Sequence, residues 1–144
     1  MQNLENILSD LKVTKILGRK NISVKNILHD SKKVGEYSLF IAIKGTSTDG
    51  HLYIEDAIRN KANSIICEVL PTQIYRDVTY IQVSDTQKSL AIIASNFYKS
   101  PSKKIKLIGV TGTNGKTSTV FFLKQLFEKL GNKVGMISTI HVEI

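Results

Sequence analysis

A glycine-rich segment from Gly112 to Thr117, reading Gly-Thr-Asn-Gly-Lys-Thr, constrains the fold of this chain more than any other feature. The apolar run Ile105 to Val110 precedes it, and apolar residues at helical spacing follow it. A strand that ends in such a turn and opens a helix presents free backbone N–H groups and the positive end of a helix dipole to an anion. The segment therefore predicts a strand, a phosphate-binding loop and a helix, in that order.

Two side chains in this loop have the chemistry that a nucleotide phosphate requires. Lys116 supplies a positive charge for the β and γ phosphates, and the Thr117 hydroxyl is placed to reach Mg²⁺. The strict Walker pattern has glycine six positions before the lysine, and this chain has Val110 there. The order of strand, loop and helix favours a nucleotide site, and an unoccupied glycine turn is the alternative.

Hydrophobic periodicity predicts an α/β fold with parallel strands. We expect helices over residues 3–11, 54–62, 84–99 and 117–130, the third of them opened by a capping box at Ser84. We expect strands over residues 22–25, 39–43, 65–69, 79–83, 105–110 and 134–140. The strand over residues 39–43 is continuously apolar, which is typical of a strand covered on both faces.

The best candidate for a linker is Ser100 to Lys104, where a proline lies among polar residues. We expect a small N-terminal α/β domain over residues 1–99, the linker over residues 100–104, and the start of a phosphate-binding domain over residues 105–144. A piece of about 40 residues is near the lower limit for folding without support. Residues 105–144 are therefore expected to be the first β-α-β unit of a larger, truncated domain.

A formal net charge of +8 raises the question of a polyanionic partner. The lysines are scattered, and no basic repeat is interleaved with aromatic residues, which favours a solvated basic surface over a nucleic-acid platform. The N-terminus does not resemble a signal peptide, and no stretch approaches the roughly 20 apolar residues of a membrane span. We expect a cytoplasmic, monomeric protein that binds neither nucleic acid nor membrane, with its one cysteine, Cys67, in the core.

Two sets of residues resemble a known family. The segment Gly109 to Ser118 resembles the nucleotide loop of the Mur ligases and of their relatives, the folylpolyglutamate and cyanophycin synthetases. A second set resembles the N-terminal domain of the two Mur ligases that add the third residue and the terminal dipeptide to the cell-wall precursor. Its members are Asp30-Ser31-Lys32, Gly35, Leu39-Phe40-Ile41-Ala42, Gly45, Asp49-Gly50-His51 and Ala57. The resemblance thus covers nearly the whole chain.

The form of the loop favours one branch of the family. Gly-Thr-Asn-Gly-Lys is similar to the loop of the ligase that adds the third residue, whereas the dipeptide-adding ligase more often has serine-rich loop residues. Two positions depart from the family pattern. Lys32 stands where the family usually has arginine, which removes a bidentate fork, and Ser138 stands where it usually has glycine. These departures concern individual substrate contacts and do not remove the assignment. The dipeptide-adding ligase stays an alternative.

The resemblance implies an ATP-dependent ligase that uses Mg²⁺. The enzyme would phosphorylate the D-glutamate carboxylate of UDP-MurNAc-L-Ala-D-Glu, and the amine of diaminopimelate or lysine would then attack the acyl phosphate to form an amide. Carried over by position, the resemblance makes Lys116 catalytic and Thr117 a ligand of Mg²⁺. It assigns ATP to Gly112, Thr113, Asn114, Gly115, Lys116, Thr117 and Ser118, and it assigns the UDP-MurNAc-dipeptide to His29, Ser31, Thr46, Ser47 and Thr48.

For His51 we expect a structural role at a helix entry and not acid-base chemistry, because no paired nucleophile or carboxylate cluster accompanies it. Two other functional classes stay open: a non-catalytic module that binds a UDP-sugar, and a nucleic-acid-associated phosphate-loop protein. Since residues 105–144 are expected to be only part of an ATP-binding domain, we expect weak or no UDP-sugar binding and no turnover by the 144-residue chain alone.

Overall fold

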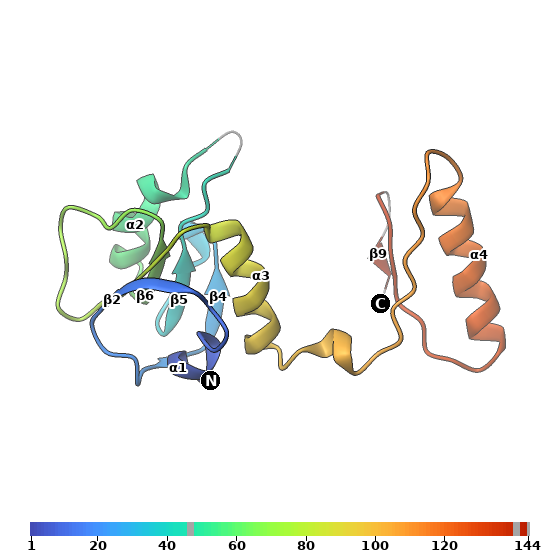
Figure 1. Cartoon of the computed structure of the whole chain (residues 1–144), viewed down its shortest axis with the longest axis horizontal. Helices are drawn as coiled ribbons and strands as arrows, with labels where there is room; N and C mark the ends of the chain where they lie inside the picture. The colour runs from blue at the N-terminus through green and yellow to red at the C-terminus, as the bar shows by residue number, and fades with distance from the viewer. Residues whose placement is uncertain (46–47, 140–141, 144) are drawn as a thin grey trace. The chain divides into compact units, whose positions relative to one another are not determined.

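The computed structural model describes residues 1–45, 48–139 and 142–143, and the chain divides into two compact units, Met1–Lys104 and Ile105–Ile144 (Figure 1). The chain contains both helices and strands, and the main sheet has four parallel strands, so the predicted α/β class is confirmed. In the described part of the chain, no helix is both long enough and apolar enough to cross a bilayer.

A five-stranded sheet forms the centre of the first unit, in the order β2-β7-β6-β5-β4. Its strands are β2 (Val13–Leu17), β4 (Asn26–Leu28), β5 (Ser38–Ile41), β6 (Ala62–Cys67) and β7 (Thr79–Val83). Strands β4 to β7 pair in parallel, and β2 pairs antiparallel with β7 at one edge. A separate antiparallel pair joins β1 (Gln2–Asn3) to β3 (Ser23–Val24). Strands β1, β2 and β4 were not predicted from the sequence.

Three α-helices cover the sheet: α1 (Leu4–Ile7), α2 (Ile54–Arg59) and α3 (Thr86–Phe97). Short 3-10 turns lie at η1 (Ser31–Lys33), η2 (Gly50–Tyr53) and η3 (Pro101–Lys103). Successive strand residues point to opposite faces of a sheet, and β5 shows the result. Leu39 and Ile41 pack in one core cluster with residues of α1 and α3, whereas Phe40 packs in a second cluster with residues of α2.

The core confirms two predictions. All four residues of β5 are buried, as expected for a strand covered on both faces. Cys67 is fully buried in the cluster beside α2, and burial raises the pKa of its thiol to about 11. The thiol therefore stays protonated in the folded protein near neutral pH, which is the behaviour of a core residue and not of a nucleophile.

Two predicted helices are shorter than the periodicity indicated. The first ends at Ile7, and the backbone reverses at Asp10 (φ 62°), which lets Leu11 pack against the core before β2 begins. The helix expected over residues 54–62 ends at Arg59, and a left-handed Lys61 (φ 70°) turns the chain into β6. Ala62 is therefore a buried strand residue; its helical spacing from Ile58 came from both residues packing in the same core cluster.

Two predicted boundaries were also wrong by one or two residues. The cap of α3 is Asp85 and not Ser84, because the Asp85 carboxylate accepts the Lys88 N–H at 2.9 Å. Val69 lies beyond the end of β6 and is 70% exposed. An aspartate is as good a helix cap as a serine, so adjacent cap residues leave the first residue of the helix ambiguous in the sequence.

The second unit contains α4 (Lys116–Lys129), β8 (Met136–Ile137) and β9 (Val142–Glu143). The predicted helix is confirmed, and Gly131 has the left-handed conformation (φ 82°) expected after a helix end. The predicted strand over residues 105–110 is wrong: among the described residues no strand pairs with this segment, and Leu107 is 70% exposed. An apolar run becomes a strand only where a neighbour satisfies its backbone hydrogen bonds.

The last predicted strand is also shortened. Of residues 134–140, only Met136 and Ile137 are in a strand, and they pair antiparallel with β9. Ile140 lies outside the described residues. The pairing is a local hairpin, because its two strands are separated by only a short stretch of chain.

Gly50 gives a test of the packing beside β5. A Cβ at this position would lie 2.7 Å from both the backbone N and the backbone O of Ile43. We expect Gly50→Ala to lower the free energy of unfolding by roughly 1 to 3 kcal/mol, because a backbone shift is needed to relieve the overlap. Urea denaturation followed by circular dichroism measures the change.

Gly35→Ala is the matched control, since a Cβ there would have no neighbour within 4 Å. We expect its free energy of unfolding to be unchanged or slightly raised. Equal losses in the two variants would contradict the close approach at Gly50.

Candidate functional site

The glycine-rich loop of the second unit leads directly into α4. Gly115 caps the helix with a left-handed backbone (φ 76°), and Gly112 has φ 154°. A Cβ at Gly115 would meet nothing within 4 Å, and one at Gly112 would come no closer than 3.7 Å to the Asn114 carbonyl oxygen. Glycine is therefore required here by backbone conformation and not by crowding.

Lys116 lies folded over this loop. Its Nζ donates to the carbonyl oxygens of Gly112 at 2.6 Å and Thr113 at 3.3 Å. Thr117 is half-buried in the first turn of α4, whereas Ser118 is exposed. The structure thus brings the seven predicted nucleotide residues together on one loop and the helix that it opens.

The first polar loop of the N-terminal unit follows β4. His29 is exposed, and Asp30 caps the short turn η1 by accepting the Lys32 N–H at 3.0 Å. Ser31 is buried, and its carbonyl oxygen accepts a hydrogen bond from Asn60 Nδ2 at 2.9 Å. This bond ties the loop to the end of α2.

A pocket of about 250 Å³ lies between this loop and α2. Its lining residues come from η1, η2 and α2: Ser31, Lys32, Tyr53, Asp56, Arg59 and Asn60. Of these, only Ser31 and Lys32 were singled out from the sequence. Asp56 and Arg59 lie three positions apart on the polar side of the helix predicted over residues 54–62, and that polar face was the signal that could have indicated them.

The second polar loop follows β5, the neighbour of β4 in the sheet. Lys44 and Asp49 form an isolated antiparallel bridge, and the Gly45 N–H donates to the Thr48 carbonyl oxygen at 2.9 Å. Thr48 is exposed, and the predicted contacts Thr46 and Ser47 lie outside the described residues. Because β4 and β5 are parallel, both polar loops leave the carboxyl edge of the sheet, which is where open α/β sheets bind ligands.

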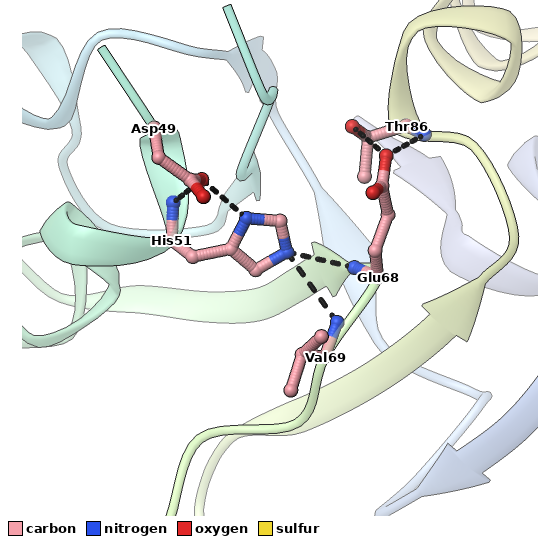
Figure 2. A network of polar contacts seen from close by, with 5 residues as sticks. All are labelled: Asp49, His51, Glu68, Val69 and Thr86. Carbon is pink, nitrogen blue, oxygen red and sulfur yellow. Dashed lines mark hydrogen bonds and ion pairs between the residues drawn. The ribbon is translucent and has the colours of Figure 1, made fainter.

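A network of polar contacts surrounds His51 (Figure 2). Its Nδ1 lies 2.6 Å from Asp49 Oδ1, and its Nε2 accepts the backbone N–H of Glu68 at 2.8 Å. Because Nε2 accepts, the ring proton is assigned to Nδ1 and is donated to the Asp49 carboxylate. The expected structural role of His51 is confirmed: both ring nitrogens are engaged in joining η2 to the end of β6.

The Asp49 carboxylate is stabilised in its charged form. The backbone N–H of His51 donates to it at 3.0 Å, and this bond, followed by the bond from the imidazole, lowers the pKa of Asp49 below its ordinary value of 3.8. Within the described residues, no three His, Cys, Asp or Glu side chains gather in a way that could hold a metal ion.

Comparisons with known proteins agree on one family. Residues 23–98 match the description "Mur ligase family, catalytic domain". The 2,6-diaminopimelate ligase acting on UDP-N-acetylmuramoyl-L-alanyl-D-glutamate from Cytophaga hutchinsonii is 47% identical over 95% of the chain, and that from Clostridium botulinum is 47% identical over 96%. The chain spans 28% and 29% of the length of these two relatives. Such coverage includes the glycine-rich loop, which lies outside the family match.

Solved structures give the same family at lower identity. The MurF ligase of Thermotoga maritima in complex with ADP is 31% identical, with a TM-score of 0.56 over 74% of the chain and 24% of the ligase. A MurF structure from Acinetobacter baumannii is 26% identical, with a TM-score of 0.59 over 74% of the chain and 23% of the other protein.

The lowered pKa of Asp49 predicts that the free energy of unfolding falls at acid pH. A carboxyl whose folded pKa is lowered contributes stability that is present above its unfolded pKa and is lost as the pH falls through its folded pKa. As the pH is lowered from about 5 to about 2.5, we expect wild type to lose stability more steeply than Asp49→Asn, which has no such proton to bind. Urea midpoints across this range measure the slopes.

Asp10→Asn, a change at an exposed carboxylate outside the network, is the control for loss of one negative charge. A slope in Asp49→Asn equal to that of wild type would show that the His51 contacts do not stabilise the Asp49 carboxylate.

Proposed function

Because this chain belongs to the Mur ligase family, we propose that it forms the substrate-binding start of an ATP-dependent ligase that adds diaminopimelate to UDP-MurNAc-L-Ala-D-Glu. The single observation that carries this proposal is the 47% identity to diaminopimelate-adding ligases across nearly the whole chain. Diaminopimelate is favoured over lysine as the third residue because the relatives' names specify it. ATP and UDP-linked precursors are cytoplasmic metabolites, so we place the proposed reaction in the cytoplasm.

The two units would divide the substrates between them. We assign residues 1–99 to the UDP-MurNAc-dipeptide, residues 100–104 to a linker, and residues 105–144 to the beginning of the ATP site. The match to the family over residues 23–98 and the two polar loops at one sheet edge support the first assignment. The glycine-rich loop that opens α4 supports the last.

The UDP part of the precursor would be held by short polar groups at the carboxyl edge of the sheet. His29 and Ser31 come from the loop after β4, and Thr48 comes from the loop after β5, with Thr46 and Ser47 of the same loop assigned on the family resemblance alone. Hydroxyl groups and free backbone N–H groups can bind a pyrimidine edge and a pyrophosphate without a metal. The shared edge would place both sets of donors along one extended ligand.

Lys116 would act on the phosphoryl group that ATP transfers to the D-glutamate carboxylate. Its ammonium group already lies at the loop, where it donates to the carbonyl oxygens of Gly112 and Thr113. Phosphate oxygens carry more negative charge than these carbonyl oxygens. When ATP binds, the ammonium group would therefore leave the carbonyl oxygens and bind the phosphate oxygens. Negative charge on the transferring phosphoryl group is then stabilised by Lys116 and by the N–H groups at the start of α4.

Mg²⁺ fits the same loop. Thr117 directly follows Lys116 in the first turn of α4 and offers a hydroxyl oxygen, the donor type that Mg²⁺ prefers. When bound, the ion would neutralise phosphate charge. The amine of diaminopimelate would then attack the acyl phosphate to give the amide and inorganic phosphate. None of the residues assigned above is proposed to select this amine.

A ligase of the dipeptide-adding MurF type is the second candidate, because the two solved structures compared above are MurF ligases. The lower identity to them, 26% and 31% against 47%, favours the diaminopimelate-adding MurE type. The glycine-rich loop argues against a module that only binds a UDP-sugar, because such a module needs no second phosphate site.

Replacing Lys116 tests the proposed nucleotide site. In a hybrid ligase in which residues 1–144 replace the corresponding segment of the Cytophaga hutchinsonii relative, we expect Lys116→Ala to lower diaminopimelate-dependent phosphate release at least about 100-fold, because charge on the transferring phosphoryl group loses its main cation. Binding of UDP-MurNAc-L-Ala-D-Glu should be unchanged. Phosphate release and calorimetric titration measure the two effects.

Lys129→Ala, at the exposed far end of α4, is the control and should keep the activity of the unmodified hybrid. Undiminished ligation by Lys116→Ala would refute the role of Lys116. A hybrid that binds the UDP-linked precursor but releases no phosphate would instead favour the non-catalytic module.

A further inference from the structure

We propose that His51 is a positioning residue that holds the second substrate loop, Lys44 to Gly50, against the end of β6. The inference rests on the proposed function, which assigns Thr48 in this loop to the UDP part of the precursor. His51 itself would touch no substrate. It would act by fixing where the loop backbone lies relative to the sheet.

The described residues of this loop are joined to one another and to the end of β5. Its base is held by the Lys44–Asp49 bridge, and the Gly45 N–H to Thr48 carbonyl bond closes its interior. The Gly50 N–H returns to the Ile43 carbonyl oxygen at 2.8 Å, just after β5. These bonds stabilise the loop internally and join it to the end of its own strand.

His51 supplies the attachment to a second strand. Its ring connects Asp49, the last residue of the bridge, to the backbone N–H of Glu68, which directly follows β6. The Val69 N–H also points at Nε2, at 3.4 Å. The imidazole side chain is only 16% exposed, so these bonds are shielded from competing water. The ring thus joins the loop to the end of a second strand.

The far end of this anchorage is itself fixed (Figure 2). Glu68 Oε1 accepts both the backbone N–H and the hydroxyl of Thr86, each at 2.9 Å, at the first residue of α3. Gln82 Nε2, on β7, donates to the Glu68 carbonyl oxygen at 2.9 Å. Hydrogen bonds therefore run without a break from the start of α3 and from β7, through Glu68 after β6, to Asp49 in the loop. His51 makes the step from Glu68 to Asp49.

Only a side chain with a donor on one side and an acceptor on the other can make this connection. Neutral imidazole has this arrangement when the proton is on Nδ1, and the glutamine side-chain amide has it as well. Leucine fills similar volume and makes neither bond. Comparing these replacements separates the hydrogen bonds of His51 from its packing.

The experiment uses the hybrid ligase defined above, with residues 1–144 either unchanged (wild type) or substituted, and titrates it with UDP-MurNAc-L-Ala-D-Glu by isothermal titration calorimetry. We expect His51→Ala and His51→Leu to raise the Kd about tenfold, as when only one loop in ten occupies the binding position. His51→Gln should restore the Kd to within about threefold of wild type, since it keeps both bonds. Leu52→Ala, a change at a 76% exposed neighbour, is the control and should bind like wild type.

The imidazole ¹⁵N signals of His51 give an independent readout, and they should show a proton on Nδ1 and none on Nε2. The opposite tautomer, or equal Kd values for wild type and His51→Leu, would overturn the inference and leave the proposed function standing. Equally weak binding by His51→Gln and His51→Leu would also overturn it, because packing alone would then explain the effect. Absence of any binding by wild type would overturn the UDP assignment, and this inference with it.

Discussion

Parallel hydrogen bonding among strands β4 to β7 is the constraint on which the first unit depends. Parallel neighbours cannot be joined by a tight turn, so each connection crosses a face of the sheet before the next strand begins. The crossover through α2 covers one face, α1 and α3 cover the other, and parallel pairing leaves the carboxyl ends of β4 and β5 side by side. The proposed precursor site follows from this arrangement, because its two polar loops are the first residues after those two strand ends.

Carboxylates stabilise the irregular segments around that edge. Asp30, Asp49 and Asp85 each accept a backbone N–H two or three residues further along the chain, at the start of η1, η2 and α3 respectively. Glu68 accepts from the start of α3 across the structure. In each case a negative charge satisfies N–H groups that a helix start leaves free. Loops held in this way present hydroxyl and N–H donors without losing their shape.

The proposed site of the second unit differs, because its residues are close together in the sequence. Gly112, Gly115 and Lys116 lie within five residues of one another, and the conformation of the loop is held by α4 and by the bonds of the lysine to loop carbonyls. Such a site can be recognised from a short stretch of sequence. The precursor site cannot, because its groups come from loops that sheet pairing brings together.

The sequence by itself determined the features that depend on neighbouring residues: the glycine-rich loop and α4, the strand Thr79–Val83, and the apolar character of β5. Tertiary structure decided the rest. A short strand such as β4 forms only because a partner supplies hydrogen bonds, whereas the apolar segment from Ile105 to Val110 lacks such a partner among the described residues and is no strand. His51 likewise became a connecting residue only when folding brought Glu68, 17 positions away, to its ring. A contact between residues so far apart in the sequence depends on which strands lie side by side in the fold. A local pattern of residues does not determine that arrangement.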